Sequence, residues 1–255
     1  MSEHIFIIAE VGINANGDIN LAKKLIDMAI ACGCDAVKFQ KKTVDEVYSQ
    51  ELLDSPHESP WGTTHRAEKE GREFGQEGFD AINEYCKGKI PWFASAFDVR
   101  SYEFLGQYNF PYNKIPSRTI ANEDLLRKVA EEGKFTFIST GIGNLRYIDT
   151  AVGIFREVKC PFMLMYCVAK YPCPDEGCAL NSIMWLKGLY GCSVGYSCHN
   201  PSILAPSIAV AFGAEAVEVH ITLDRASYGK DQAASFEKKG LEYIVRDCNR
   251  VGALL

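Results

Sequence analysis

The sequence has no cluster of basic residues and no long apolar run, and these two absences exclude broad classes of partner. Its 255 residues carry 27 Lys and Arg against 33 Asp and Glu, a formal net charge of −6. Nucleic-acid-binding surfaces need a basic patch or arm, so we expect no nucleic-acid partner. No segment approaches the roughly 20 consecutive apolar residues of a membrane-spanning helix, so we expect no membrane contact.

The chain also lacks a recognisable secretion signal and a paired CxxC framework for zinc. Its first residues, MSEHIFIIAEVG, are acidic and run directly into a predicted strand, unlike a signal peptide. The ten cysteines lie mostly in apolar segments such as IACGCDAVKF, the pattern of buried thiols in a reducing compartment. We therefore expect a cytoplasmic protein with free cysteines. A structural zinc site at Cys32 and Cys34, or at Cys173 and Cys178, is the less favoured alternative.

What the sequence does contain is a regular alternation of short apolar runs and longer segments of helical period. The apolar runs are rich in β-branched and aromatic residues, as expected for parallel strands buried on both faces. They predict strands at 5–10, 35–40, 91–95, 112–116, 135–140, 161–167, 193–197 and 215–220. Because a helical segment follows each run, we predict that residues 1–255 form one α/β domain, a single (β/α)8 TIM barrel. An open doubly wound sheet is the alternative.

One connection, residues 41–75, is much longer than a usual βα loop. It follows the second predicted strand, and in barrel enzymes the loops at this end of the strands surround the active site. We therefore expect a lid or a binding loop. A decorative or partly disordered insertion is the alternative.

Polar residues fall at or just past the ends of the predicted strands, where barrel active sites lie. They are Glu10, Lys38, Gln40, Ser95, Lys114, Ser117, Ser139, Tyr166, Ser197, His199 and His220. Lys38 and Lys114 interrupt otherwise apolar strands, and a buried ammonium needs an anionic partner or solvent. They either clamp the carboxylate or phosphate of a ligand, with serine hydroxyls beside them, or form internal pairs such as Lys38 with Glu10.

Two histidines, His199 and His220, end predicted strands that are consecutive along the chain. Neighbouring strands lie about 4.8 Å apart, which suits two imidazoles binding one divalent ion. Glu10, Glu218 or Asp231 would be the nearby carboxylate. The alternative is one general base and one hydrogen-bonding neighbour. Asp231 itself lies in the loop YGKDQAAS and is either a site residue or a helix cap.

A series of motifs resembles those of the sialic acid (N-acetylneuraminate) synthase family, in the same order along the whole chain. They are IIAEVGINANGD, GCDAVKFQ, SAFDVRSYEFL, NKIPS, ISTGIGN, YCVAKYP, GYSCHN and EVHITLDRASYGKDQAAS. The resemblance implies a barrel enzyme that joins phosphoenolpyruvate to an aldose such as N-acetylmannosamine, giving a nonulosonic (sialic-type) acid and phosphate. It also implies a divalent metal ion, Mn²⁺ in the first place, with Mg²⁺ or Co²⁺ as alternatives.

The resemblance further implies roles for individual residues. His199 and His220 would be the metal ligands, and Lys38, Gln40 and Lys114 would surround the carboxylate of phosphoenolpyruvate. The remaining substrate-binding hydroxyls, most of them on the phosphate, would be those of Ser95, Ser117, Ser139 and Ser197. The sugar would contact Glu10, Tyr171 and Asp231. The implied catalytic set is Glu10, Lys38, Lys114 and Asp231.

Four positions depart from the usual residues of that family. Ala15 and Cys198 stand where the family has His and Asp, and Thr119 and Ala169 stand where it has Glu and Asn. The resemblance covers the barrel only, without the small antifreeze-like domain that the family usually appends. The acceptor therefore stays open among precursors of sialic, legionaminic and pseudaminic acids.

The partners implied are small molecules, phosphoenolpyruvate and an aldose, and the family's head-to-tail pairing implies a homodimer. Two other functions stay open at this point. One is a metal-dependent pyruvate aldolase or lyase on the same barrel, and the other is a non-catalytic sugar-binding relative.

Overall fold

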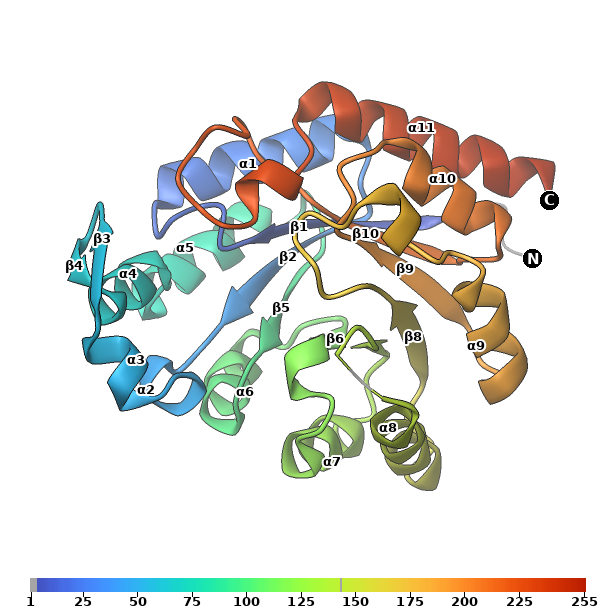
Figure 1. The fold of residues 1–255 in the computed structure, drawn as a ribbon, viewed down its shortest axis with the longest axis horizontal. Helices are drawn as coiled ribbons and strands as arrows, with labels where there is room; N and C mark the ends of the chain where they lie inside the picture. Colours follow the sequence, from blue (N-terminus) through green and yellow to red (C-terminus); the bar gives the residue numbers. More distant parts are fainter. Residues whose placement is uncertain (1–3, 143) are drawn as a thin grey trace.

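The computed structural model describes residues 4–142 and 144–255, and its central feature is a nearly closed parallel barrel (Figure 1). Eight strands form one sheet in the order β5-β2-β1-β10-β9-β8-β7-β6. The two outer strands, β5 and β6, pack side by side, although no backbone ladder joins them in the described chain. Helices alternate with the strands around the sheet. The predicted (β/α)8 barrel is confirmed.

The barrel strands lie close to the predicted bounds and are almost fully buried, as their apolar composition requires. They are β1 (Phe6–Gly12), β2 (Ala36–Lys41), β5 (Trp92–Ala96), β6 (Asn113–Ile115), β7 (Thr136–Ser139), β8 (Phe162–Tyr166), β9 (Val194–Cys198) and β10 (Ala216–His220). Parallel pairing aligns their carboxyl ends at one mouth of the barrel. Polar residues at those ends therefore share one region of space.

The outer helices are α1 (Ile19–Cys32), α5 (Gln76–Cys86), α6 (Val99–Leu105), α7 (Glu123–Glu131), α8 (Leu145–Glu157), α9 (Ser182–Tyr190), α10 (Leu204–Ala211) and α11 (Lys238–Leu254). The ends of α1 show how the sequence sets a helix boundary. The Asp18 carboxylate accepts hydrogen bonds from the backbone N–H groups of Asn20 and Leu21. Gly33 ends the helix with a φ of 81°, which favours glycine.

The long segment 41–75 has regular structure. It contains α2 (Val44–Val47), α3 (Gln50–Asp54), the hairpin β3 (Pro56–Ser59) and β4 (Gly62–Thr64), and α4 (His65–Arg72). Figure 1 shows these elements together on one side, beyond the end of β2. The segment is thus placed to supply side chains to the barrel mouth.

All ten cysteines are free, and nine of them are buried. The expected free thiols are confirmed, and in one of the two alternative zinc pairs Cys173 Sγ lies 4.0 Å from Cys178 Sγ. Within residues 4–142 and 144–255, no cysteine joins a group of three or more side chains with metal-ligand spacing. Across the same residues, every helix is too short or too polar to cross a bilayer.

Two glycine substitutions should change stability in opposite directions. Gly33→Ala places a side chain in a left-handed conformation at the end of α1, so the free energy of unfolding should fall by about 1 kcal/mol. Gly153 lies within α8, with open space where a Cβ would stand. Gly153→Ala should therefore raise the free energy of unfolding by about 0.5–1 kcal/mol. Urea unfolding measures both free energies of unfolding. An unchanged free energy of unfolding in Gly33→Ala would contradict the assigned helix end.

Candidate active site

A cavity of about 240 Å³ opens at the carboxyl ends of the barrel strands. Its lining includes the predicted residues Glu10, Lys38, Gln40, Ser95, Lys114, Ser117, Ser139, Tyr171, Ser197, His199 and His220. Asp231 lines a second cavity that adjoins the first. Tyr166, from the predicted ring of polar residues, instead donates a hydrogen bond to the Cys178 carbonyl. The residues predicted from the strand ends thus lie around one cavity, with Tyr166 as the exception.

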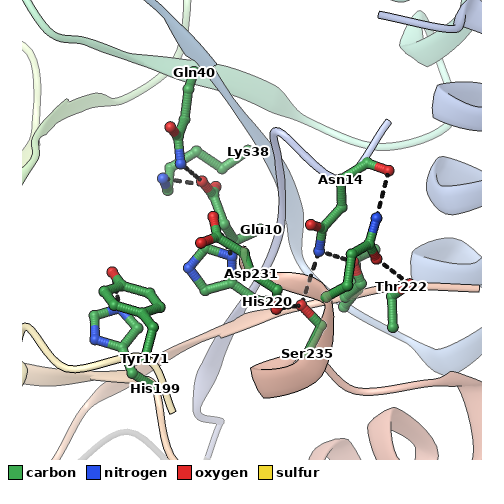
Figure 2. Close-up of polar contacts among 12 residues, drawn as sticks. Glu10, Asn14, Lys38, Gln40, Tyr171, His199, His220, Thr222, Asp231 and Ser235 are labelled. Carbon is green, nitrogen blue, oxygen red and sulfur yellow. Dashed lines mark hydrogen bonds and ion pairs between the residues drawn. The ribbon is translucent and has the colours of Figure 1, made fainter. Parts of the chain in front are cut away.

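Strand register brings three of these side chains to one level of the barrel. Glu10 on β1 is the Cα partner of His220 on β10 and of Lys38 on β2. Paired residues on parallel strands project to the same face of the sheet. Figure 2 shows the Glu10 carboxylate beside the Lys38 ammonium, with the His220 ring below it.

Both strand lysines have buried carboxylate partners inside the barrel. The Lys38 Nζ lies 2.6 Å from Glu10 Oε2 and 3.5 Å from Glu218 Oε1. It also donates a 3.0 Å hydrogen bond to Ser95 Oγ. The Lys114 Nζ donates a 2.7 Å hydrogen bond to Glu218 Oε2. The internal pairing of Lys38 with Glu10 is therefore present, and both lysines line the cavity as well.

The pKa values of this cluster follow from burial and from the alternation of charge. Burial alone would lower the pKa of Lys38, but Glu10 and Glu218 outweigh burial and raise it. Burial lowers the pKa of Lys114, and Lys38 lowers it further against the attraction of Glu218. The pKa of Glu218 is well below its usual range because Lys114 and Lys38 outweigh burial. Glu218 is therefore a carboxylate at neutral pH.

Glu218, which the sequence offered only as one of three candidate carboxylates beside the histidines, is a central member of this site. It lies two residues before His220 on β10, and side chains two apart on a strand share a face. That spacing within the run EAVEVH was the signal that would have placed it in the barrel interior. Glu218 also accepts a 3.3 Å hydrogen bond from Ser197, so this serine is partly engaged by protein.

The two histidines face the same cavity, with ring centroids 5.6 Å apart and planes inclined at 52°. His199 Nδ1 lies 2.6 Å from the Val168 carbonyl, which can only accept, so the neutral ring has its proton on Nδ1. His199 Nε2 then carries a lone pair and accepts a 2.6 Å hydrogen bond from the Tyr171 hydroxyl. Burial and the neighbouring His220 lower the pKa of His199 to about 4. The ring is therefore neutral at pH 7.

The donor atoms of these histidines suit a divalent metal ion. The buried His220 Nδ1 has no hydrogen-bond partner within the described chain, and the Asp231 Oδ2 lies 3.9 Å from it. The tautomer of His199 directs a lone pair into the cavity, as metal-binding imidazoles require. A metal at His199 Nε2 would take the place of the Tyr171 hydroxyl, which Figure 2 shows against that ring.

A second group with ligand spacing lies outside the barrel, in His57, His65 and Glu68, and is the one such group of three in the described ranges. The two rings are stacked, with centroids 4.2 Å apart and planes only 8° from parallel. Lone pairs of parallel stacked rings do not converge on one point. The Glu68 carboxylate is also occupied by Lys69 at 2.6 Å and by Arg72 at 2.7 Å. This arrangement is a poorer fit to a metal than the barrel histidines.

The four positions that depart from the family pattern lie in different surroundings. Ala169 lines the first cavity, where it offers no hydrogen bond. Thr119 donates a 3.2 Å hydrogen bond to the Pro116 carbonyl. The buried Cys198 thiol lies 3.2 Å from the Asn200 carbonyl, and Ala15 is buried in the core. Only Ala169 of the four lies on the wall described for the first cavity.

The sequence and the fold match known proteins along nearly the whole chain. The NeuB family matches residues 25–255. N-acetylneuraminate-9-phosphate synthase of Drosophila melanogaster is 36% identical over 247 residues, which cover 95% of this chain and 66% of the relative. N,N'-diacetyllegionaminic acid synthase of Campylobacter jejuni is 32% identical over 252 residues, covering 96% and 75%. The chain thus spans 66% to 75% of the length of these two relatives.

A solved structure gives the same result at the level of the fold. The N-acetylneuraminic acid (sialic acid) synthetase of Leptospira borgpetersenii, in complex with citrate, aligns with a TM-score of 0.89 and 35% identity. The alignment covers 98% of this chain and 85% of that chain.

The metal-free protein should lose stability between pH 7 and pH 5. His199 has a pKa of about 4 in the fold and 6.5 when unperturbed, so the unfolded chain binds a proton that the folded chain does not. The free energy of unfolding should therefore rise with pH across this window, with His199 contributing about 2 kcal/mol between pH 5 and pH 7. Urea unfolding in EDTA at both values tests this. The free energy of unfolding of His199→Gln should depend less steeply on pH. The same slope in both proteins would contradict the assigned role of His199.

Proposed function

The chain belongs to the NeuB family, and from that premise we propose that it condenses phosphoenolpyruvate with an aldose of the N-acetylhexosamine type. The products would be a nonulosonic acid and inorganic phosphate. The similar proteins named above are synthases of sialic-type acids. The observation that carries the proposal is that two buried ammonium groups, two buried carboxylates and two imidazoles line one cavity at the mouth of the barrel.

Phosphoenolpyruvate is a small polyanion, and the first cavity offers donors of matching kind. Each lysine ammonium has three N–H donors. Glu218 accepts one from Lys114, which leaves donors for a ligand carboxylate or phosphate. Ser117 and Ser139 add hydroxyls, and Arg118 adds a further positive charge on the cavity wall. Because Glu10 and Glu218 balance the two lysines, the site is charged enough to orient an anion and remains stable without one.

The proposed reaction forms one carbon–carbon bond and one carbon–oxygen bond to water, and it breaks the carbon–oxygen bond to phosphate. The enol carbon C3 attacks the aldehyde carbon, and the aldehyde oxygen gains a proton. Water adds to the cationic C2 and loses one proton, and the resulting tetrahedral centre loses its hydroxyl proton and expels phosphate to leave a keto group. Of the two protons of the water, one is thus balanced by the new hydroxyl and the other leaves with the phosphate. Glu10 is the proposed proton carrier, since it contacts Lys38 and Gln40 within the cavity.

His199 and His220 are the proposed ligands of a divalent ion, Mn²⁺ in the first place, with the Asp231 carboxylate beside them. When bound, such an ion supplies Lewis-acid polarisation of the aldehyde oxygen. The protein's own contribution is orientation, because near-attack positioning of two substrates lowers the barrier without new chemistry. Tyr171, which now hydrogen-bonds His199, would turn toward the sugar.

The function is tested by product formation from defined substrates and by one variant of the donor site. Incubation with Mn²⁺, phosphoenolpyruvate and N-acetylmannosamine, free or 6-phosphorylated, should release phosphate only when both substrates are present. Mass spectrometry should find a product that contains the carbons of both.

Lys114→Met should raise the KM for phosphoenolpyruvate about 10-fold or more, because a charged hydrogen bond is lost, and should change the KM for the sugar less.

Lys128→Met is the matched control, because Lys128 pairs with Glu103 on the exposed surface. If Lys114→Met raises the KM for the sugar more than the KM for phosphoenolpyruvate, Lys114 does not belong to the phosphoenolpyruvate site. Product formation from pyruvate in place of phosphoenolpyruvate would instead identify a pyruvate aldolase. Absence of turnover with every hexosamine tested would favour a sugar-binding protein without catalysis.

Metal binding has its own test, which does not depend on turnover. After removal of metal with EDTA and dialysis against Mn²⁺, the wild-type protein should retain about one ion per chain, as one two-imidazole site predicts. His220→Ala should lose that ion and keep its fold, as judged by metal analysis and circular dichroism. His57→Ala is the control, because it disrupts the other group with ligand spacing. Loss of metal from His57→Ala but not from His220→Ala would refute the barrel site.

A further inference from the structure

The charged groups buried inside the first cavity cancel one another. The Lys38 ammonium lies 2.6 Å from the Glu10 carboxylate. The Lys114 ammonium lies 2.7 Å from the Glu218 carboxylate. Two ammonium groups and two carboxylates bring no net charge to the cavity. A phosphate monoester carries about −1.5 to −2 charges at pH 7, and phosphoenolpyruvate has a carboxylate as well. This donor therefore needs positive charge that the four buried groups do not supply.

Arg118 supplies such a charge at the cavity wall. It lines the first cavity and also the second cavity, whose volume is about 440 Å³. Three lysine or arginine side chains line the first cavity within the described ranges, and Arg118 is the one without a carboxylate partner there. Arg118 is also an exposed residue, whereas Lys38 and Lys114 are buried. A ligand that enters the cavity can therefore reach its guanidinium group.

A short turn places Arg118 beside hydroxyl groups of the same wall. The turn is the 3-10 helix η2 (Ser117–Thr119), which follows β6. The Ser117 hydroxyl accepts a 2.9 Å hydrogen bond from the Gly141 backbone N–H, so its own hydrogen can be donated to a ligand. Ser139 adds a second hydroxyl to the wall. A guanidinium beside neutral hydroxyl donors is well suited to the oxygens of a phosphate.

Segment 41–75 contacts the Arg118 guanidinium and orients it. The Cζ atom of Arg118 lies 5.4 Å from the centre of the Tyr48 ring, within the range of a cation–π interaction. Its Nη2 donates a long, 3.5 Å hydrogen bond to the Val47 carbonyl. A guanidinium has five N–H donors in one plane, so other donors can bind a phosphate while the ring contact persists. Tyr48 directly follows α2, so the folded segment helps to hold this side chain.

The phosphate of phosphoenolpyruvate matches Arg118 better than its carboxylate does. The phosphate carries more negative charge than the carboxylate, and it leaves the site as inorganic phosphate, so it needs a path to solvent. Arg118 is exposed, whereas Lys38 and Lys114 are only 3% and 4% exposed. The carboxylate stays in the product and suits the buried ammonium groups. A neutral sugar would gain less from a guanidinium without a carboxylate partner.

We infer that Arg118 binds the phosphate of phosphoenolpyruvate and makes the site specific for this donor over pyruvate, with the Tyr48 ring orienting the guanidinium. This inference rests on the proposed function and adds a specificity-determining residue to its donor site. It also gives segment 41–75 a role in binding the donor.

The test measures the binding of phosphoenolpyruvate, inorganic phosphate and pyruvate by calorimetry, without a sugar. Arg118→Gln should weaken the binding of phosphoenolpyruvate and of inorganic phosphate about 10-fold or more, because a charged hydrogen bond is lost. The affinity for pyruvate, which has no phosphate, should not change. Arg127→Gln is the matched control, because Arg127 pairs with Glu157 on the exposed surface. Unchanged affinity for phosphoenolpyruvate in Arg118→Gln, or an equal loss for pyruvate, would overturn the inference.

Conservative variants test the contribution of geometry. Arg118→Lys keeps the charge but loses the planar set of donors, so it should recover only part of the affinity for phosphoenolpyruvate. Tyr48→Leu should weaken that affinity about 2- to 5-fold, because a cation–π contact is lost. Tyr48→Phe keeps the ring and should bind as the wild-type protein does. Equal losses in Tyr48→Leu and Tyr48→Phe would refute the role of the ring.

Kinetic measurements separate this inference from the proposed function. With N-acetylmannosamine as acceptor, Arg118→Gln should raise the KM for phosphoenolpyruvate about 10-fold or more and the KM for the sugar less. A larger rise for the sugar would place Arg118 in the acceptor site and overturn the inference. If phosphoenolpyruvate binds through Arg118 but no product forms, the proposed function fails and the inference stands. If Arg118→Gln forms product with an unchanged KM for phosphoenolpyruvate, the inference fails and the proposed function stands.

Discussion

The site depends on a four-charge cluster in the barrel interior, formed by Glu10, Lys38, Glu218 and Lys114. Each of these groups is almost fully buried, so none would be tolerated alone. Alternating positive and negative groups offset the free-energy cost of burying these side chains. Every other feature of the first cavity is arranged around this cluster. It fixes where an anion can be oriented, and it places the Glu10 carboxylate beside β10, the strand that carries His220.

The two cavities differ in their balance of charge. The first is lined by lysines that already have carboxylate partners, so it can stay empty or accept a small anion without losing its structure. The second has an excess of cations, and one edge of the Arg72 guanidinium has no partner within the described residues. It is assembled in part from segment 41–75 and from the loop after β10. Strands and loops thus contribute surfaces of different charge balance to the mouth of the barrel.

Much of this arrangement was predictable from the sequence, and the remainder depends on register and on loop structure. Buried parallel strands appear as apolar runs, so the barrel and the strand-end residues followed directly. The partners of Lys38 and Lys114 could not be decided, because pairing depends on which residues face each other across the barrel. The contact between the tilted Tyr171 and His199 rings depends on a loop path that no periodicity encodes. Arg72 lies in the long insertion, where its charge looks like that of any surface helix.

The charge cluster also affects the junction between β5 and β6, where no backbone ladder joins the two strands in the described chain. Ser95 lies on β5, Lys38 on β2, Glu218 on β10 and Lys114 on β6, and consecutive members of this series are in polar contact. Side chains inside the barrel thus connect β5 and β6, the two strands that no backbone ladder joins in the described chain. An anion that draws either ammonium group away from Glu218 would loosen this bridge. Ligand affinity and the mechanical closure of the barrel are therefore thermodynamically linked.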